Sequence, residues 1–252
     1  TSPSLHYALC KGLLDSGANV LSIGMSTTPM TYFAHYHLQT DAAVMVTGSH
    51  NPPEYNGFKM VLDKHSFFAE AIQNLQLFIE LKNISQGTGQ LINVDIKKEY
   101  VNRNLQNINL EKKMKIAWDI GNGTVGAVID QFTQQLSKAE HIVINKEVDG
   151  TFPNHHPDPT VPENMKQLIE TVLTNSCDIG LAFDGDGDRL GVIDNKGQII
   201  WADQYMLLLA KEISTLYQNP KIIMDVKSSK VFFEEVKKFN CDPIMFKTGH
   251  SP

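Results

Sequence analysis

Residues 178–194 read Asp-Ile-Gly-Leu-Ala-Phe-Asp-Gly-Asp-Gly-Asp-Arg-Leu-Gly-Val-Ile-Asp, which is an apolar run, a loop of aspartates and glycines, and a second apolar run. Each apolar run has the length and composition of a buried β-strand. Amphipathic helical patterns flank the stretch at 163–174 and 203–217, and short strands alternate with helices toward both ends of the sequence. This rhythm predicts crossover units around a mostly parallel sheet, and therefore an α/β protein.

Breaks in the rhythm divide the sequence into three predicted domains. A polar stretch with two glycines at 83–90 ends the first series of elements, and a new series starts near residue 100. A third series begins near residue 203 and is short when the sequence stops. We expect domains at 1–95, 96–200 and 201–252. Because a sheet that has only begun cannot close, we also expect the chain to be part of a longer protein.

The composition excludes several classes of protein. Of 252 residues, 42% are hydrophobic and 20% are charged, as in globular domains. No apolar run approaches the ~18 residues of a membrane helix, so we expect no membrane association. The net charge is −6 and no basic block is present, so we expect no nucleic-acid partner. Three scattered cysteines without paired or metal-ligand spacing indicate a reducing cytoplasm.

The aspartate loop at 184–189 predicts a site for a hard cation. Asp184, Asp186 and Asp188 alternate with glycines, whose conformational freedom lets three carboxylates converge on one Mg²⁺ or Ca²⁺. A calcium-binding helix-loop-helix is excluded, because its sixth and twelfth positions would be Arg189 and Asn195 instead of Gly and Glu. A solvated acidic turn is the alternative, but three neighbouring acids at the end of an apolar strand repel one another strongly without a cation.

A second loop, Thr-Gly-Ser-His-Asn-Pro at 47–52, follows the apolar run at 42–46. By itself it is as consistent with a polar turn as with a nucleophilic Ser49 beside His50. A serine that can carry phosphate, combined with a divalent cation, provides the parts for phosphoryl transfer. The adjacent His155 and His156 are interpreted as part of a structural loop, because neighbouring residues seldom bind one ion.

Together the two loops resemble the α-D-phosphohexomutases, in the phosphomannomutase/phosphoglucomutase branch. The resemblance rests on residues 47–59 and 184–189, and it extends to 1–5, 119–123, 152–159, 225–227 and 247–251. It implies consecutive mixed-sheet α/β domains, in a chain that lacks the start of domain 1, most of domain 3 and all of domain 4.

The resemblance also implies roles for particular residues. Ser49 matches the phosphoserine that donates and regains a phosphoryl group, and its oxygen joins the three aspartates of the loop as a ligand of one Mg²⁺. Lys59 and His50 match residues around the phosphoserine, and the choice between them as general acid/base stays open. The residues that match substrate-binding positions are Arg189, Lys227, His250 and Asn51.

The implied reaction interconverts hexose 1-phosphate and hexose 6-phosphate, of mannose or glucose, through a hexose 1,6-bisphosphate that also acts as activator. We expect this chain alone to be inactive, because the family's remaining substrate contacts lie outside it. The alternatives are a glucosamine or N-acetylglucosamine phosphate mutase, a Mg²⁺-dependent sugar phosphatase, and a non-catalytic relative. The expected partners are small hexose phosphates, and the sequence indicates no oligomeric state.

Overall fold

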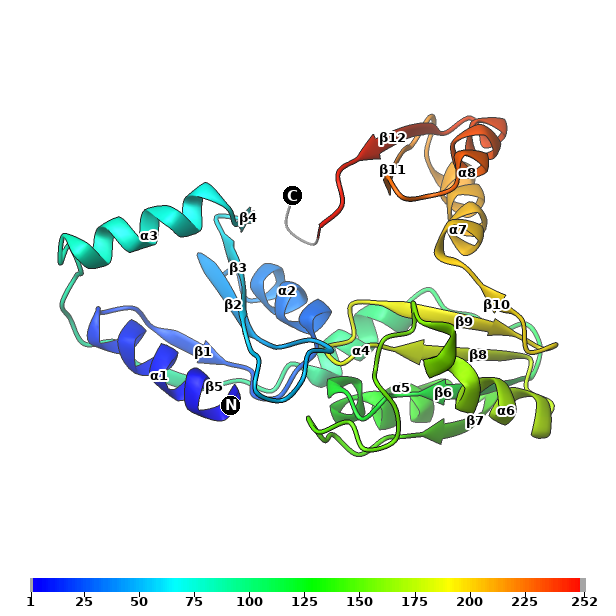
Figure 1. Ribbon diagram of the computed structural model, residues 1–252, viewed down its shortest axis with the longest axis horizontal. Helices are drawn as coiled ribbons and strands as arrows, with labels where there is room; N and C mark the ends of the chain where they lie inside the picture. Colours follow the sequence, from blue (N-terminus) through cyan, green and yellow to red (C-terminus); the bar gives the residue numbers. More distant parts are fainter. Residues whose placement is uncertain (1, 250–252) are drawn as a thin grey trace. The chain divides into compact units, whose positions relative to one another are not determined.

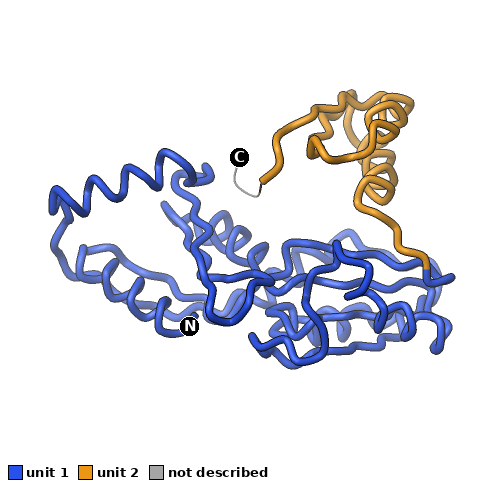
Figure 2. The backbone as a smooth tube through the Cα atoms, viewed as in Figure 1, with its two compact units in different colours: residues 1–197 blue, residues 198–252 orange. Residues whose placement is uncertain are grey.

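The computed structural model describes residues 2–249, and the chain forms two compact units, Thr1–Gly197 and Gln198–Pro252. Figure 2 colours the two units separately. The domain boundaries expected at 95/96 and 200/201 stay predictions. Among the described residues, no helix is both long enough and apolar enough to cross a membrane.

Two small sheets form the amino-terminal part of the first unit. Strand β1 (Val20–Ser22) pairs in parallel with β5 (Leu91–Asn93), and the second sheet is antiparallel in the order β2-β3-β4. At the end of the β2–β3 ladder Val46 lies opposite Phe58, so the connection at 47–57 leaves and re-enters the sheet at one edge. The other elements of this part are β2 (Ala42–Val46), β3 (Phe58–Leu62), β4 (His65–Phe67), α1 (Ser2–Asp15), α2 (Thr28–His37) and α3 (Glu70–Glu80).

A larger mixed sheet forms the rest of the first unit, with strand order β9-β8-β6-β7 (Figure 1). Strands β7 and β8 run parallel to β6, whereas β9 runs antiparallel to β8. The loop between β8 and β9 is too short for a crossover, so the chain must turn back as a hairpin. These strands are β6 (Met114–Asp119), β7 (Ala139–Ile144), β8 (Ile179–Phe183) and β9 (Leu190–Asp194). The predicted α/β class with mixed sheets is confirmed.

Helices cover both faces of this sheet. Trp118 of β6 shares a buried cluster with Ile129 of α5 on one face. Gly180 of β8 faces α6 on the other side, where an added Cβ would lie 2.7 Å from Val172. The helices are α5 (Ile129–Gln135) and α6 (Lys166–Thr174), and each follows a short 3₁₀ turn, η1 (Thr124–Ala127) and η2 (Pro162–Met165).

A separate buried cluster fixes α2 against the larger sheet's helices. Met30 and Ala34 of α2 pack with Ile96, with Val101 of α4 (Lys97–Leu105) and with Val128, which directly precedes α5. Full burial of a large apolar side chain stabilises a fold by about 1.5–3 kcal/mol. The cluster therefore holds α2 in one position, with the backbone amide of its first residue, Thr28, 2.9 Å from the carbonyl oxygen of Asp186.

The second unit is a short α/β assembly. Strands β11 (Lys221–Asp225) and β12 (Asp242–Phe246) pair in parallel. The connection between them contains α8 (Lys230–Glu235) and η3 (Val236–Phe239). The unit also contains β10 (Ile199–Ile200) and α7 (Ala202–Leu216). Its core cluster consists of Ala210, Ile222, Phe232, Val236 and Cys241.

Candidate active site

Ser49 lies at the tip of the β2–β3 connection in a strained conformation. Its φ is 53°, in the left-handed region that non-glycine residues seldom adopt, and such strain costs on the order of 1–3 kcal/mol. The hydroxyl of Thr47 accepts a hydrogen bond from the Ser49 amide at 2.8 Å, which helps to hold this conformation. Gly48 packs against the backbone of Tyr55, so the loop folds closely on itself.

The aspartate loop is a tight turn closed on the carboxylate of Asp184. Oδ1 of Asp184 accepts hydrogen bonds from the backbone amides of Asp188 at 2.9 Å and Arg189 at 3.0 Å. Gly187 has a φ of +71°, a conformation that favours glycine. Asp184 and Asp186 are fully buried, while the side chain of Asp188 is 19% exposed.

The serine loop and the aspartate loop meet directly. Oγ of Ser49 lies 2.9 Å from Oδ2 of Asp184 and 2.9 Å from Oδ1 of Asp186, within hydrogen-bond distance of both. At Gly185 an added Cβ would lie 2.1 Å from the Ser49 carbonyl oxygen, so only glycine permits this approach. The predicted nucleophile and two of the predicted metal ligands therefore form one site.

Lys59 brings a positive charge to the same carboxylates. From β3, its Nζ donates to Oδ2 of Asp186 and to Oδ2 of Asp188, each at 2.6 Å. The hydroxyl of Thr28 donates to Asp186 Oδ2 at 2.7 Å. The start of α2 therefore supplies a contact that fixes Asp186, because Thr28 is fully buried.

Arg189 joins the aspartate loop to a third segment. Its Nε donates to Oδ2 of Asp184 at 3.0 Å and its Nη1 to Oδ1 of Asp158 at 2.9 Å. Nη2 contacts Nδ1 of His50, whose ring nitrogen is also 3.2 Å from Ser49 Oγ. Arg189 therefore touches the serine, aspartate and 152–160 loops through one guanidinium group.

The two buried aspartates differ in their affinity for protons. Burial, together with the neighbouring charges of Asp186 and Asp188, raises the pKa of Asp184 to about 6. Burial opposes ionisation of Asp186 as well, but hydrogen bonds from Lys59, Thr28 and Ser49 hold its pKa down at about 2. Asp186 and Asp188 raise the pKa of Lys59 against the effect of burial, so its ammonium stays charged. Positive charge stabilises this cluster of carboxylates.

The aspartate loop fits a hard divalent cation. One carboxylate oxygen from each of Asp184, Asp186 and Asp188 lies within 4.8 Å of the others, and oxygen is the ligand type that Mg²⁺ prefers. The raised pKa of Asp184 is expected where carboxylates are buried close together and repel one another. A bound cation would relieve that repulsion. Ser49 Oγ lies beside two of them and could act as an additional ligand.

Besides Arg189, the residues predicted to bind substrate are Asn51, Lys227 and His250. Asn51 is exposed, and its backbone amide closes a turn with the carbonyl oxygen of Gly48 at 2.9 Å. Lys227 belongs to the second unit, in the turn after β11, where its amide donates to Asp225 Oδ1. His250 lies outside the described residues. The substrate-binding roles of these three residues stay predictions.

Two residues that shape the site, Thr28 and Asp158, were not among the predicted site residues. Thr28 is the first residue of α2, and the side chain of its neighbour Thr27 caps that helix. Asp158, quoted only as part of a motif, orients Arg189. Neither carries a sequence signal of its function, because each acts through a contact with a residue distant in the chain.

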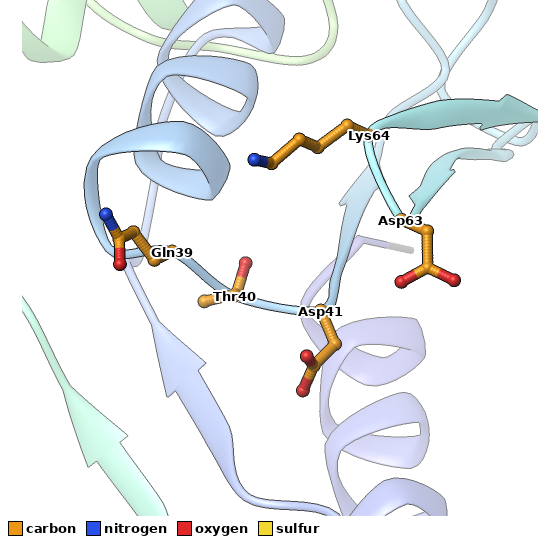
Figure 3. A pocket seen from close by; sticks show the side chains of 5 residues that line it. All are labelled: Gln39, Thr40, Asp41, Asp63 and Lys64. Atoms are coloured by element: carbon orange, nitrogen blue, oxygen red, sulfur yellow. The ribbon is translucent and has the colours of Figure 1, made fainter.

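A separate open pocket of about 370 Å³ lies between the residues after α2 and the β3–β4 turn (Figure 3). Its lining residues are Gln39, Thr40, Asp41, Asp63 and Lys64. These are polar side chains of two connecting segments, and none of the residues predicted to act in chemistry lines the pocket. The chemistry of the first unit is concentrated at the serine and aspartate loops instead.

The chain is similar in sequence to proteins of one family. The family models described as phosphoglucomutase/phosphomannomutase, alpha/beta/alpha domain I and domain II match residues 1–79 and 98–197. A phosphomannomutase/phosphoglucomutase of Pseudomonas aeruginosa is 42% identical over the whole chain, which covers 54% of that relative. A phosphoglucomutase of Neisseria meningitidis is 42% identical, with 55% of its length covered.

A solved structure is similar in both sequence and fold. The crystal structure of a phosphoglucomutase/phosphomannomutase family protein from Burkholderia thailandensis matches with a TM-score of 0.93 and 39% identity. The match covers 99% of this chain and 56% of that protein. The chain therefore spans about half the length of the curated relatives and of the solved structure that it matches.

Proposed function

The chain belongs to the phosphoglucomutase/phosphomannomutase family, and from that premise we propose that the protein is a Mg²⁺-dependent phosphohexomutase. The proposed reaction interconverts the 1- and 6-phosphates of glucose or mannose through a hexose 1,6-bisphosphate. It is proposed for a protein of the relatives' full length, because this chain covers about half of them. The three cysteines are unpaired and buried, which is in keeping with the cytoplasmic location expected from the sequence.

The observation that carries the proposal is the meeting of Ser49 with the aspartate loop. Oγ of Ser49 lies 2.9 Å from carboxylates of Asp184 and Asp186 that are more than a hundred residues away in the sequence. A serine hydroxyl beside two carboxylates contributes little to apolar packing. A phosphoserine at this position would share a divalent cation with those carboxylates. Bound Mg²⁺ would neutralise the negative charge that develops on the phosphoryl group during its transfer.

Lys59 is the residue that we assign to charge stabilisation and to proton donation at the sugar oxygen. Its Nζ donates to Asp188 and to Asp186, and Asp186 also faces Ser49; the raised pKa of Lys59 keeps it protonated. His50 is less suited, because its Nδ1 faces Arg189, whose guanidinium can only donate. That ring nitrogen must act as the acceptor in this contact, so it is not available to take the proton of the sugar hydroxyl.

Arg189 is the residue that we assign to holding phosphate oxygens near Ser49. Asp184 and Asp158 fix its guanidinium from two sides, and both contacts lie at or below 3.0 Å. A planar guanidinium that is oriented before binding loses less freedom when it grips a phosphate. In this scheme the phosphoryl group passes from Ser49 to one sugar hydroxyl, and the other phosphoryl group of the bisphosphate returns to Ser49.

The mass of the full-length protein tests the proposal first. We expect a phosphatase-sensitive increment of about 80 Da on the peptide that contains Ser49. A coupled assay with glucose 1-phosphate and mannose 1-phosphate should then show isomerisation that requires Mg²⁺. Ser49→Ala should abolish both the increment and the activity, whereas Ser66→Ala, at an exposed position in β4, should preserve them. A Ser49→Ala protein with normal turnover would refute the phosphoserine mechanism.

The same assay separates the alternatives. A sugar phosphatase would release inorganic phosphate without forming the isomeric sugar phosphate. A glucosamine or N-acetylglucosamine phosphate mutase would act on those sugars in preference to glucose and mannose. A non-catalytic relative would show neither product, although its aspartate loop would still bind Mg²⁺.

A further inference from the structure

A second group of side chains that could hold a metal ion joins the serine loop to the 152–160 loop. His50, His156 and Asp158 each present one ligand atom, and these atoms lie within 4.8 Å of one another. Two imidazole nitrogens and one carboxylate oxygen differ chemically from the all-oxygen aspartate loop. Imidazole favours Zn²⁺ and other first-row transition ions, whereas Mg²⁺ favours oxygen.

Hydrogen bonds to its Oδ1 orient the carboxylate of Asp158. Its Oδ1 accepts hydrogen bonds from the amide of Thr160 at 3.0 Å, the hydroxyl of Thr160 at 2.7 Å, and Nη1 of Arg189 at 2.9 Å. Its Oδ2 faces Nε2 of His50 at 3.8 Å. Hydrogen bonds of this kind orient ligands in metalloproteins, and here they turn Oδ2 toward the imidazole.

His155 fixes the backbone on which His156 is mounted. The ring of His155 spans from Oδ2 of the buried Asp119 to the carbonyl oxygen of His156, at 2.9 Å on each side. The ring of His156 then lies edge-on to that of His50, with 5.5 Å between the ring centroids. The two adjacent histidines therefore have different roles, since His155 is structural and His156 faces His50.

We propose that Nε2 of His50, a ring nitrogen of His156 and Oδ2 of Asp158 bind Zn²⁺ or a similar transition ion, separately from the aspartate loop. Metal bonds of about 2.0–2.2 Å would place the ligand atoms about 3.0–3.5 Å apart. The separation of His50 Nε2 and Asp158 Oδ2, 3.8 Å, is close to that range. His156 is exposed, so its ring can turn toward the ion and water can complete the coordination.

Occupation of this site would act on Ser49 through His50. A metal on Nε2 leaves the ring proton on Nδ1. That nitrogen lies 3.2 Å from Ser49 Oγ and contacts Arg189 Nη2. The N–H would donate to the serine oxygen and repel the guanidinium, which itself only donates. A transition ion would thus weaken the contact between Arg189 and His50 and restrain the serine hydroxyl.

Calorimetric titration of the chain with Zn²⁺, in buffer that holds Mg²⁺ in excess, tests the site. We expect wild-type protein to bind Zn²⁺, and His156→Gln to bind it at least tenfold more weakly. His65→Gln, at an exposed position in β4, is the matched control and should bind like wild type. Asp186→Asn alters the aspartate loop and should retain Zn²⁺ binding. Thermal unfolding of each variant checks that its fold is intact.

Three results would overturn the proposal. The first is a wild-type titration without Zn²⁺ uptake, and the second is Zn²⁺ binding by His156→Gln that is as tight as that of wild type. Loss of Zn²⁺ binding in Asp186→Asn together with retention in His156→Gln would assign the ion to the aspartate loop. Because the readout is binding, none of these results bears on the phosphoserine chemistry proposed above.

Discussion

Removal of the Lys59 ammonium should strengthen the binding of Mg²⁺ to this chain. Nζ of Lys59 donates to Asp186 and to Asp188 at 2.6 Å each, and its side chain is only 19% exposed. Two of the three carboxylates proposed to hold Mg²⁺ are therefore already bound to a cation. An incoming Mg²⁺ must compete with the ammonium for these oxygens. Once bound, Mg²⁺ would also be repelled by the nearby positive charge of Lys59.

The size of the effect follows from the protonation of Asp186. Its pKa is held at about 2 against an ordinary value of 3.8, which corresponds to on the order of 2 kcal/mol at about 1.4 kcal/mol per pKa unit. Lys59, Thr28 and Ser49 share that stabilisation. If Lys59 supplies about half or more, Lys59→Met should tighten Mg²⁺ binding by roughly 5- to 30-fold, since about 1.4 kcal/mol corresponds to a factor of ten.

Calorimetric titration of wild type and Lys59→Met with Mg²⁺ measures this change. Lys146→Met is the matched control, because it removes the same charge from an ammonium that pairs with Asp130 at 2.7 Å. The control should bind Mg²⁺ like wild type. Mg²⁺ should also raise the melting temperature of Lys59→Met more than that of the control. Equal or weaker Mg²⁺ binding by Lys59→Met would refute the idea that the ammonium competes with the ion.

Three further predictions concern protonation and close backbone contacts. The pKa of Asp184 is raised to about 6, so protonation of this carboxylate should lower the affinity for Mg²⁺ as the pH drops below about 6. The fall should reach at most about tenfold per pH unit, and titrations with Mg²⁺ at about pH 5.5 and 7.5 measure it. A hydrogen bond to Asp119 raises the pKa of His155, so the pair stabilises the fold fully below about pH 6.5 and loses that contribution as the pH rises through the raised value. The loss of unfolding free energy in His155→Gln should therefore be larger at pH 6 than at pH 9 in urea denaturation, and a pH-independent loss would contradict the ion pair. Gly185→Ala should lower the free energy of unfolding by at least about 2 kcal/mol and lower the melting temperature, because its Cβ would lie 2.1 Å from a backbone oxygen of the serine loop. Gly12→Ala is the control, because Gly12 has open space around it in α1, and this change should be neutral or stabilising.

The sequence by itself determined the features that depend on neighbouring residues. The alternation of strands and helices follows from local hydrophobic periodicity, and the α/β class is confirmed by the observed sheets. Three aspartates that alternate with glycines in one short loop can converge, so their spacing was enough to predict a cation site, and the structure places one oxygen of each within 4.8 Å of the others. The residues of the serine loop and the aspartate loop were specific enough to indicate the family, which the comparisons confirm.

Only the tertiary structure decided which side chains share one site. Ser49 and Asp184 meet because the β2–β3 and β8–β9 connections are brought together, with Gly185 allowing backbone to approach backbone. The proton affinities of Asp184 and Asp186 diverge for the same reason, since burial and hydrogen bonds from distant residues act on otherwise identical carboxylates. No local pattern encodes such contacts, because they depend on how elements far apart in the chain pack against each other.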